Sequence, residues 1–170
     1  MELLVIRHGI AEDPDEWAEQ GHSDDERPLT KDGRRRMRNA ARGLRRLVPD
    51  LPLLATSPLL RARETAAIVS AAYDGTPAGD VAEALRPEAA FADFLPWLES
   101  RADHAAAGIV GHEPHLSCLV SWLLTGRTRS FIELKKGGAC LLTFDDVLGS
   151  GRARLLWSLA PGHLRRLGGS

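Results

Sequence analysis

Short apolar runs alternate with amphipathic segments along most of this chain. Residues 3–6, 51–55 and 107–111 form three apolar runs that predict buried strands, and residues 81–85 form a weaker one. Apolar side chains that recur three and four positions apart predict the helices between them. These helices are expected over residues 30–48, 57–73, 89–100 and 114–124. Strands that alternate with helices indicate an α/β fold with three layers and a mostly parallel sheet.

The last part of the chain departs from this alternation. The apolar runs at residues 139–144 and 153–159 are joined by a Gly-rich turn, which predicts an antiparallel hairpin at the C-terminal edge of the sheet. Glycine and proline within residues 75–79 predict a linker, and the Gly-Gly-Ser end, residues 168–170, is expected to fray. The whole chain, residues 1–170, has the size of one domain with its own core.

Residues at the predicted helix starts support these boundaries. Thr30 is placed to cap the first long helix, and Ser57 is placed to cap the second, with Pro58 at its first helical position. Pro114 suits the first turn of a later helix in the same way.

Charge is unevenly distributed along the chain, although the net charge is only −1. Residues 10–29 are rich in Asp and Glu, which predicts a surface loop with a short helical turn around Trp17. The polar face of the helix over residues 30–48 is almost entirely arginine. This face comprises Arg35, Arg38, Arg42, Arg45 and Arg46. Such a stripe could bind a polyanion, but a solvated helix face is the simpler interpretation.

Composition narrows the range of functions. A net charge near zero provides no basic field for nucleic acid, so we expect no nucleic-acid partner. No apolar stretch approaches the roughly 20 residues of a membrane span, so we expect no membrane partner. Cys118 and Cys140 lie far apart without metal-binding spacing, and no secretory peptide precedes the first strand. The sequence therefore predicts a reduced, cytoplasmic protein, and we expect a monomer.

Polar residues follow three of the predicted strands. Arg7-His8-Gly9 ends the first, a segment from Ser57 to Thr65 follows the second, and Gly111-His112-Glu113 ends a later one. Because the carboxyl ends of parallel strands lie at one edge of a sheet, these residues are expected to converge. Arginine side chains and the N–H groups of helix amino termini both favour an anion. The sequence therefore predicts a phosphate pocket.

Only one of two arginines in the second segment, Arg61 and Arg63, can bind phosphate in this pocket. Because they are two positions apart on one helix, they cannot face the same ligand. We expect Arg61, nearer the helix start, to bind phosphate and Arg63 to pair with an acid. His112 taken alone would be a satisfied buried histidine, but its position after a strand-like run that ends in glycine favours a site residue.

These residue types define a reaction that needs no metal and no cofactor. Neutral His8 could attack phosphorus through a ring nitrogen and give a phosphohistidine enzyme, which water then hydrolyses. Neighbouring arginines would keep the pKa of His8 low and the nucleophile unprotonated. Arg7 and Arg61 would hold the nonbridging oxygens, and His112 would donate to them. A metal hydrolase with the two histidines as ligands is less consistent, because no Asp lies at ligand spacing and arginines repel a cation.

The chain resembles the histidine phosphatase superfamily of phosphoglycerate mutase-like enzymes, which carries an Arg-His-Gly motif at the first strand. The resemblance spans nearly the whole chain. It is strongest to the small bacterial phosphohistidine phosphatases of the SixA type, which share Arg27-Pro28-Leu29-Thr30 followed by Gly33, and Leu60-Arg61-Ala62. The resemblance implies that His8 is the nucleophile. It also implies a phosphate pocket of Arg7, His8, Arg61 and His112, with Ser57 beside it.

Larger members of this superfamily place a carboxylic acid opposite the nucleophile to protonate an alkoxide leaving group, and this chain has no clear match. Glu83, Glu88 and Asp93 are candidates by position. Short relatives resemble this chain in lacking the acid, and an imidazole leaves more easily than an alkoxide. We therefore expect phosphohistidine in a protein as the substrate. Lys135 and Lys136 could touch a substrate tail, although such lysines are more often simply solvated.

Two other functions are compatible with the same residues. One is a phosphatase of a small phosphorylated molecule, a phosphoester. The other is a noncatalytic phosphate-binding or polyphosphate-binding module that uses the arginine-rich helix as a docking face. The intact set of Arg7, His8, Arg61 and His112 argues against the binding module, because a pure binder has no use for a nucleophile.

Overall fold

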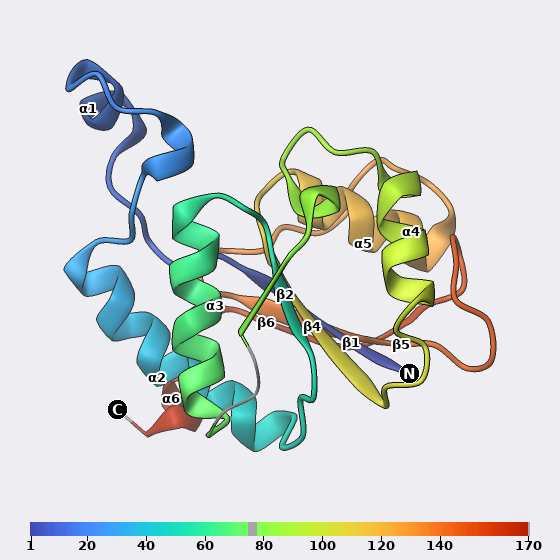
Figure 1. Cartoon of the computed structure of the whole chain (residues 1–170). Helices are drawn as coiled ribbons and strands as arrows, with labels where there is room; N and C mark the ends of the chain where they lie inside the picture. Colours follow the sequence, from blue (N-terminus) through green and yellow to red (C-terminus); the bar gives the residue numbers. More distant parts are fainter. Residues whose placement is uncertain (75–77, 170) are drawn as a thin grey trace.

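The computed structural model, which describes residues 1–74 and 78–169, contains a six-stranded sheet with helices on both faces (Figure 1). The strands are β1 (Glu2–Arg7), β2 (Leu54–Thr56), β3 (Ala78–Val81), β4 (Ala106–Gly111), β5 (Ala139–Thr143) and β6 (Arg154–Leu159). Their order in the sheet is β3-β2-β4-β1-β5-β6. The four strands β1, β2, β3 and β4 run parallel to one another, whereas β5 runs antiparallel to both β1 and β6. The predicted fold class, with its antiparallel edge hairpin, is confirmed.

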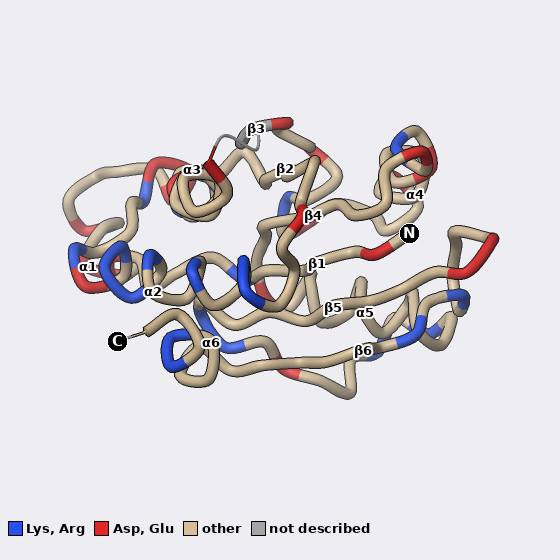
Figure 2. The backbone as a smooth tube through the Cα atoms, turned by 90° about the horizontal axis from the view of Figure 1, so that it is seen from below, with Lys and Arg blue, Asp and Glu red and all other residues tan. Residues whose placement is uncertain are grey.

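Helices cover the two faces of the sheet. They are α1 (Pro14–Glu19), α2 (Lys31–Leu47), α3 (Leu60–Ala72), α4 (Phe91–Glu99), α5 (His115–Thr125) and α6 (Pro161–Gly168), with short 3-10 helices at η1 (Asp24–Glu26) and η2 (Glu83–Leu85). In Figure 1, α2, α3 and α6 lie on one side of the sheet and α4 and α5 on the other. Figure 2 shows the Lys and Arg positions concentrated along α2 and α6. The fold therefore has three layers, with one strongly basic helical layer.

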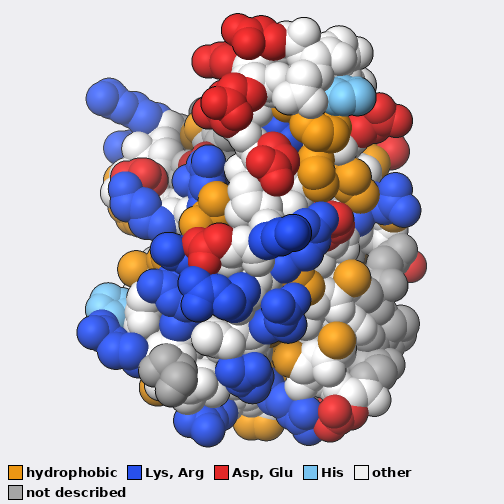
Figure 3. Space-filling model, turned by 90° about the vertical axis from the view of Figure 1, so that its left-hand side faces the viewer, with side chains coloured by type: hydrophobic (Ala, Val, Ile, Leu, Met, Phe, Trp, Pro, Cys, Tyr) orange, Lys and Arg blue, Asp and Glu red, His pale blue; other side chains and the backbone are white. Residues whose placement is uncertain are grey.

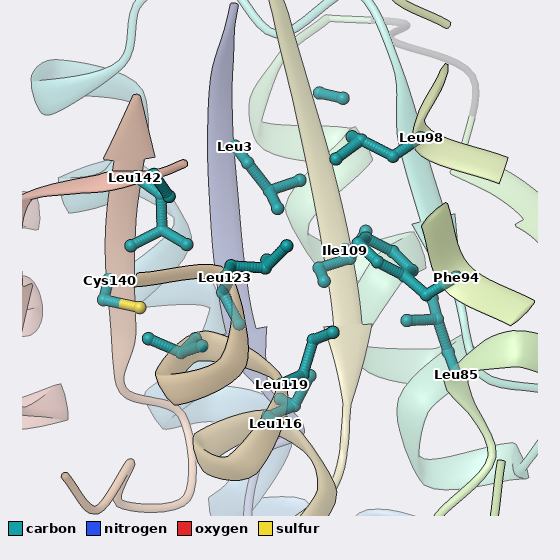
Figure 4. Packing of buried hydrophobic residues seen from close by; sticks show 14 of the residues in the cluster. Leu3, Leu85, Phe94, Leu98, Ile109, Leu116, Leu119, Leu123, Cys140 and Leu142 are labelled. Carbon is teal, nitrogen blue, oxygen red and sulfur yellow. The ribbon is translucent and has the colours of Figure 1, made fainter. Parts of the chain in front are cut away.

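Alternating side chains of β1 supply both halves of the core. Leu3 and Val5 enter the layer beneath α4 and α5, and Leu4 and Ile6 enter the layer beneath α2, α3 and α6. All four are 0% exposed, and the burial of each contributes about 1.5–3 kcal/mol. Figure 4 shows Leu3 close to the leucines of α5 and to Ile109 of β4. The core therefore holds β1, and the motif at its carboxyl end, firmly at the centre of the sheet.

Residues 81–85 do not form the strand predicted for them. β3 ends as this segment begins, and Glu83–Leu85 forms η2 instead. Ala82 and Leu85 are both buried in the same core cluster. A strand would turn side chains three positions apart to opposite faces, whereas a 3-10 turn brings them to the same face. Burial of both side chains therefore overrides the strand-like composition.

Two segments predicted to be irregular contain regular structure. Gly79, assigned to a linker, belongs to β3, while residues 75–77 lie outside the described residues. Gly168, assigned to a fraying terminus, belongs to α6, and Ser170 lies outside the described residues. The short α6 is stabilised by packing rather than by its own periodicity, because Leu164 is fully buried.

Close backbone contact joins α6 to α2. An added Cβ at Gly43 would lie 2.0 Å from the carbonyl oxygen of Leu164, and one at Gly168 would lie 1.9 Å from that of Asn39. Only glycine permits this approach at either position. Gly43, which looks like a weak point in the middle of α2, is therefore a packing requirement.

Three arginines of the predicted stripe bond carbonyl oxygens at the ends of neighbouring helices. Arg42 and Arg46 donate to the last two residues of α6, Arg42 through Nε at 3.2 Å. Arg45 Nη1 donates to the carbonyl oxygen of Ala72, the last residue of α3, at 2.7 Å. Carbonyl groups at a helix C-terminus lack partners within the helix and favour a cation. These arginines therefore cap α3 and α6.

The predicted helix starts are confirmed in part. Thr30 caps α2 and accepts a hydrogen bond from Gly33 N at 2.8 Å. Pro114 is the N-cap of α5, and the helical turn expected in the acidic segment is α1. Ser57 is not the cap of α3, because that helix begins at Leu60. The hydroxyl of Ser57 is engaged elsewhere, in the site described next.

Candidate active site

The carboxyl ends of β1, β4 and β2 open at one edge of the sheet. In the register of β1 and β4, Arg7 lies beside Gly111, so His8 and His112 leave the sheet at the same level. His8 N also donates to Gly111 O at 3.0 Å. Ser57 leaves the adjacent end of β2. The structure thus brings together the residues that follow the three strands.

His8 is held with one ring nitrogen free. Its side chain is buried, and Nδ1 lies 2.7 Å from the carbonyl oxygen of Gly9. Because a carbonyl oxygen can only accept, Nδ1 carries the proton in the neutral ring. The lone pair of Nε2 is therefore available to attack an electrophile.

His112 lies beside His8, with 5.1 Å between the ring centroids. His112 Nε2 lies 2.8 Å from Ser57 Oγ, and its buried Nδ1 has no hydrogen-bond partner in the part of the chain that the structure describes. Ser57 Oγ also accepts from Leu59 N at 3.4 Å. When the hydroxyl donates its own proton to Nε2 of neutral His112, the ring carries its proton at Nδ1, where it can be donated to an anion.

Two guanidinium groups complete the cluster, and each is only partly paired. Arg7 Nη1 donates to Leu134 O at 2.7 Å. Arg61 donates from Nη1 to the carbonyl oxygen of Asp24 at 2.8 Å, and its Nη2 lies 2.9 Å from Asp24 Oδ2. In both arginines Nε is buried and has no partner within residues 1–74 and 78–169. A buried donor without an acceptor is costly, so both groups are suited to a bound anion.

The environment keeps both histidines neutral. Burial lowers the pKa of His8 to about 3, and the charges of Arg61, Arg7 and Lys136 add to the effect, against an opposing hydrogen bond to Gly9. Burial also lowers the pKa of His112 to about 2, with further contributions that include those of His8 and Arg61. Near pH 7 the ring of His8 is therefore unprotonated, the state in which a histidine can act as a nucleophile.

The two arginines at the start of α3 point in different directions. Arg61 is 4% exposed and takes part in the cluster, whereas Arg63 is exposed. The acid partner expected for Arg63 belongs to Arg61 instead: within residues 1–74 and 78–169, Asp24 pairs with Arg61 and no carboxylate pairs with Arg63. The helix geometry that separates the two side chains is as predicted.

The acidic segment contributes two residues that the sequence did not single out for the site. Asp24 Oδ1 accepts from Arg27 Nε at 2.7 Å, and Arg27 Nη1 donates to Glu12 O at 2.8 Å. Arg27 is 8% exposed, and its charge lowers the pKa of His112. One feature of the sequence could have identified Arg27 as a site residue. It is the only Lys or Arg in the acidic segment and begins the Arg-Pro-Leu-Thr motif, and a role as a solvated surface loop explains neither.

Thr65 connects the loop after β1 to α3. Its Oγ1 accepts from Gly9 N at 3.0 Å and donates to the carbonyl oxygen of Arg61 at 2.7 Å. The preceding residue, Glu64, accepts from Leu29 N at 2.7 Å and pairs with Arg34. The motif that follows β2 therefore positions the loops after β1 as well as supplying Arg61.

Glu113 has a comparable positioning role for Arg7. Its Oε1 accepts from Leu134 N at 3.3 Å, and its Oε2 accepts from Ser117 Oγ at 2.5 Å. The carbonyl oxygen of Leu134 is the acceptor for Arg7. Glu113, the residue after His112, thus fixes the loop whose carbonyl oxygen orients Arg7.

The three carboxylates considered as a general acid are all exposed. Glu83 and Glu88 lie 2.7 and 3.8 Å from Arg86, and Asp93 lies in the first turn of α4. The charged groups that act most strongly on the pKa of His8 are all cations. The structure therefore places none of the three as an obvious partner of the nucleophile.

The described residues provide neither a metal site nor a membrane-spanning helix. No group of three or more His, Cys, Asp or Glu side chains there is arranged to hold a metal ion. Among the helices of residues 1–74 and 78–169, none is long and apolar enough to cross a membrane.

Comparisons with known proteins agree with this geometry. The model of the histidine phosphatase superfamily (branch 1) matches residues 3–94, just over half of the chain. An uncharacterized protein of Picosynechococcus sp. is 41% identical over 140 residues, which cover 81% of this chain and 82% of that protein.

Solved structures share the fold over nearly their full length. The protein histidine phosphatase SixA complexed with tungstate gives a TM-score of 0.81 at 24% identity, covering 96% of this chain and 99% of that chain. The α-ribazole phosphatase of Shigella flexneri gives a TM-score of 0.74 at 18% identity, covering 95% and 97%.

The chain belongs to the histidine phosphatase superfamily, branch 1. It is an enzyme of the phosphatase class, and the family inferred from its motifs is confirmed.

Proposed function

We propose that the protein is a metal-independent phosphatase in which His8 accepts the phosphoryl group, and that its substrate is phosphohistidine in a protein. The observation that carries this proposal is a set of unpaired buried groups. Arg7 Nε, Arg61 Nε and His112 Nδ1 have no hydrogen-bond partner among the described residues, and these three side chains gather around His8. A phosphoryl group has the oxygens to satisfy each of them.

The first chemical step transfers the phosphoryl group to the enzyme. His8 Nε2 uses its lone pair to form a bond to phosphorus, and the bond from phosphorus to the substrate's imidazole nitrogen breaks. The leaving imidazole keeps the electron pair of that bond and takes a proton from solvent. Arg7, Arg61 and His112 stabilise the charge on the nonbridging oxygens as it redistributes.

The second step releases inorganic phosphate. A water molecule attacks phosphorus, loses a proton to solvent, and displaces His8 Nε2, which recovers its lone pair. The hydrogen bond from Nδ1 to the carbonyl oxygen of Gly9 keeps the ring in the same orientation throughout. His8 is ready for another cycle without any redox change or metal ion.

Phosphohistidine fits this site because its leaving group needs little help. An alkoxide must be protonated as it leaves, and Glu83, Glu88 and Asp93 are all exposed to solvent. An imidazole is a much weaker base than an alkoxide and departs more easily. The shared fold with a protein histidine phosphatase complexed with tungstate supports the same choice.

A small phosphoester is the second candidate substrate. The α-ribazole phosphatase of Shigella flexneri has the same fold, and the arginines around His8 would bind the phosphoryl oxygens of a phosphoester as well as those of phosphohistidine. In that case a group other than the three exposed carboxylates would have to protonate the leaving oxygen.

A substrate panel tests the proposal. Phosphohistidine peptide, phosphoserine peptide, a sugar phosphate and p-nitrophenyl phosphate are each assayed with and without EDTA. We expect the phosphohistidine peptide and p-nitrophenyl phosphate to be hydrolysed far faster than the other two, with no effect of EDTA. Faster hydrolysis of phosphoserine or the sugar phosphate would favour the second candidate, and inhibition by EDTA would contradict metal independence.

A further inference from the structure

A small hollow of about 60 Å³ lies next to His8, between the first turns of α2 and the helix α6. Its apolar part is formed by Met37, Ala40 and Pro161, and three cations, Arg36, Lys136 and Arg165, line it as well. Gly9, the residue after the nucleophile, forms part of the wall. The hollow therefore combines an apolar lining with a cationic one at the border of the site.

The loop that carries Lys136 is hydrogen-bonded to the backbone of Arg7 and His8. Gly137 N donates to the carbonyl oxygens of Arg7 and His8 at 3.2 and 3.0 Å. The φ of Gly137 is 76°, a left-handed conformation that other residues rarely adopt. Lys136 is thereby held next to His8, and its charge contributes to the low pKa of that residue.

A second depression extends the hollow across the surface of α2. The two share Arg36 and Arg165, and the second adds Arg35 and Asn39. In Figure 3, which faces this side of the molecule, Lys and Arg side chains gather in a band below the acidic side chains at the top. The two depressions form one path that leads from the site along α2 and α6.

The cations along this path outnumber the acids. Asp32 pairs with both Arg35 and Arg36, at 2.5 Å each. Within the part of the chain that the structure describes, Arg165 and Lys136 have no carboxylate partner. Unlike Arg42, Arg45 and Arg46, which bond helix ends, these two cations are not used by the fold.

We propose that this path is a docking site for an acidic stretch of the phosphorylated protein substrate, on one side of its phosphoryl group. A run of Asp and Glu would satisfy Lys136 and Arg165, and an apolar side chain within the run would fill the hollow over Met37. The apolar lining and the extension along two helices favour a polypeptide over a small polyanion. This proposal rests on the proposed function, which places a protein in the site.

Two phosphohistidine peptides of equal length test the docking site. One carries Asp and Glu beside the phosphohistidine, and the other carries Gln and Ser at the same positions. For the wild-type protein, we expect kcat/KM to be about tenfold higher for the acidic peptide, an advantage that declines as salt is added. Arg165→Glu should remove this advantage while hydrolysis of p-nitrophenyl phosphate stays within about twofold, because that substrate has no acidic side chains to pair with Arg165.

Arg152→Glu is the matched control, because Arg152 is exposed and lies in the turn before β6. That turn is near the N-terminal end of β1, whereas the site is at its carboxyl end. It should leave the preference for the acidic peptide unchanged. Lys136→Gln removes a positive charge without adding a negative one and should reduce the preference in part. A partial loss in this variant would show that the loss in Arg165→Glu does not come from a folding defect. Equal kcat/KM for the two peptides with the wild-type protein, or equal losses in Arg165→Glu and Arg152→Glu, would overturn the docking site.

The same peptides used as competitive inhibitors of p-nitrophenyl phosphate hydrolysis separate this proposal from the proposed function. If neither peptide is hydrolysed but the acidic one inhibits more strongly, and Arg165→Glu removes the difference, the docking site stands and the substrate assignment fails. If the peptides are hydrolysed and inhibit equally, the docking site fails and the substrate assignment stands.

Discussion

Arg61 is the residue in which the geometry of the site can be tested most sharply. It is buried beside the histidines and held by Asp24, whereas Arg63, two positions along the same helix, is exposed. Arg61→Ala should lower kcat/KM by about 10²-fold or more, the usual cost of losing one preorganised charge-stabilising donor. Arg63→Ala, the matched control, should have a small effect. Comparable losses in the two variants would mean that the wrong face of α3 has been assigned to the site.

The neutral histidines make the stability of the fold depend on pH. Their ordinary pKa of 6.5 is lowered to about 3 in His8 and about 2 in His112. Below pH 6.5 the unfolded chain therefore binds protons that the folded site does not, so the free energy of unfolding falls as the pH is lowered toward 3. Each histidine contributes a slope of up to about 1.4 kcal/mol per pH unit in this window.

His112→Asn removes one of these two groups and should flatten the decline. Urea unfolding of the wild-type protein and the variant between pH 7 and pH 4 measures the difference in slope. Parallel curves would show that His112 is not held neutral in the folded protein.

At the scale of elements, the contact between α2 and α6 provides a test of packing. Alanine usually stabilises a helix relative to glycine. In Gly43→Ala, however, the new Cβ would lie 2.0 Å from the carbonyl oxygen of Leu164, so we expect a loss of about 1–3 kcal/mol in the free energy of unfolding. Thermal and urea unfolding measure the loss.

Gly162→Ala is the control for this substitution. The nearest atom to its new Cβ is the end of the Arg165 side chain, at 3.9 Å. This variant should be neutral or slightly more stable. A stabilising Gly43→Ala would show that α6 does not pack against α2 in the way described.

The elements that the sequence predicted well are those whose side chains carry a local pattern of their own. β1 and α2 are of this kind, because β1 is a continuous apolar run and the apolar positions of α2 recur at helix spacing. α6 and η2 were missed because their order depends on contacts: Leu164 is buried against α2, and Ala82 and Leu85 fill the core together. No short window of sequence contains the partner that stabilises such an element.

At the scale of the whole molecule, the same distinction applies to the site. Arg7, His8 and His112 follow strands directly, so a parallel sheet suffices to predict that they meet. Asp24 reaches Arg61 from a segment that reads as a solvated acidic loop. Its role depends on how the whole segment folds back over α3, which local composition does not encode.

The exposure of Glu83, Glu88 and Asp93 leads to a prediction about leaving groups. For a series of substituted phenyl phosphates, the rate should fall steeply as the pKa of the leaving phenol rises, because an unassisted oxyanion must carry its own charge. Glu88→Gln should leave this dependence unchanged, because Glu88 is exposed. A flat dependence in the wild-type protein that becomes steep in Glu88→Gln would identify Glu88 as a general acid and move the substrate toward ordinary phosphoesters.

The most direct test of the account is to trap the phosphorylated enzyme. The protein is mixed with a ³²P-labelled substrate, quenched within the first turnovers, digested and mapped. The account predicts label on His8 alone that is labile in acid and stable in base, and a folded His8→Ala variant with neither label nor turnover. Label on another residue, or substantial turnover by His8→Ala, would contradict it.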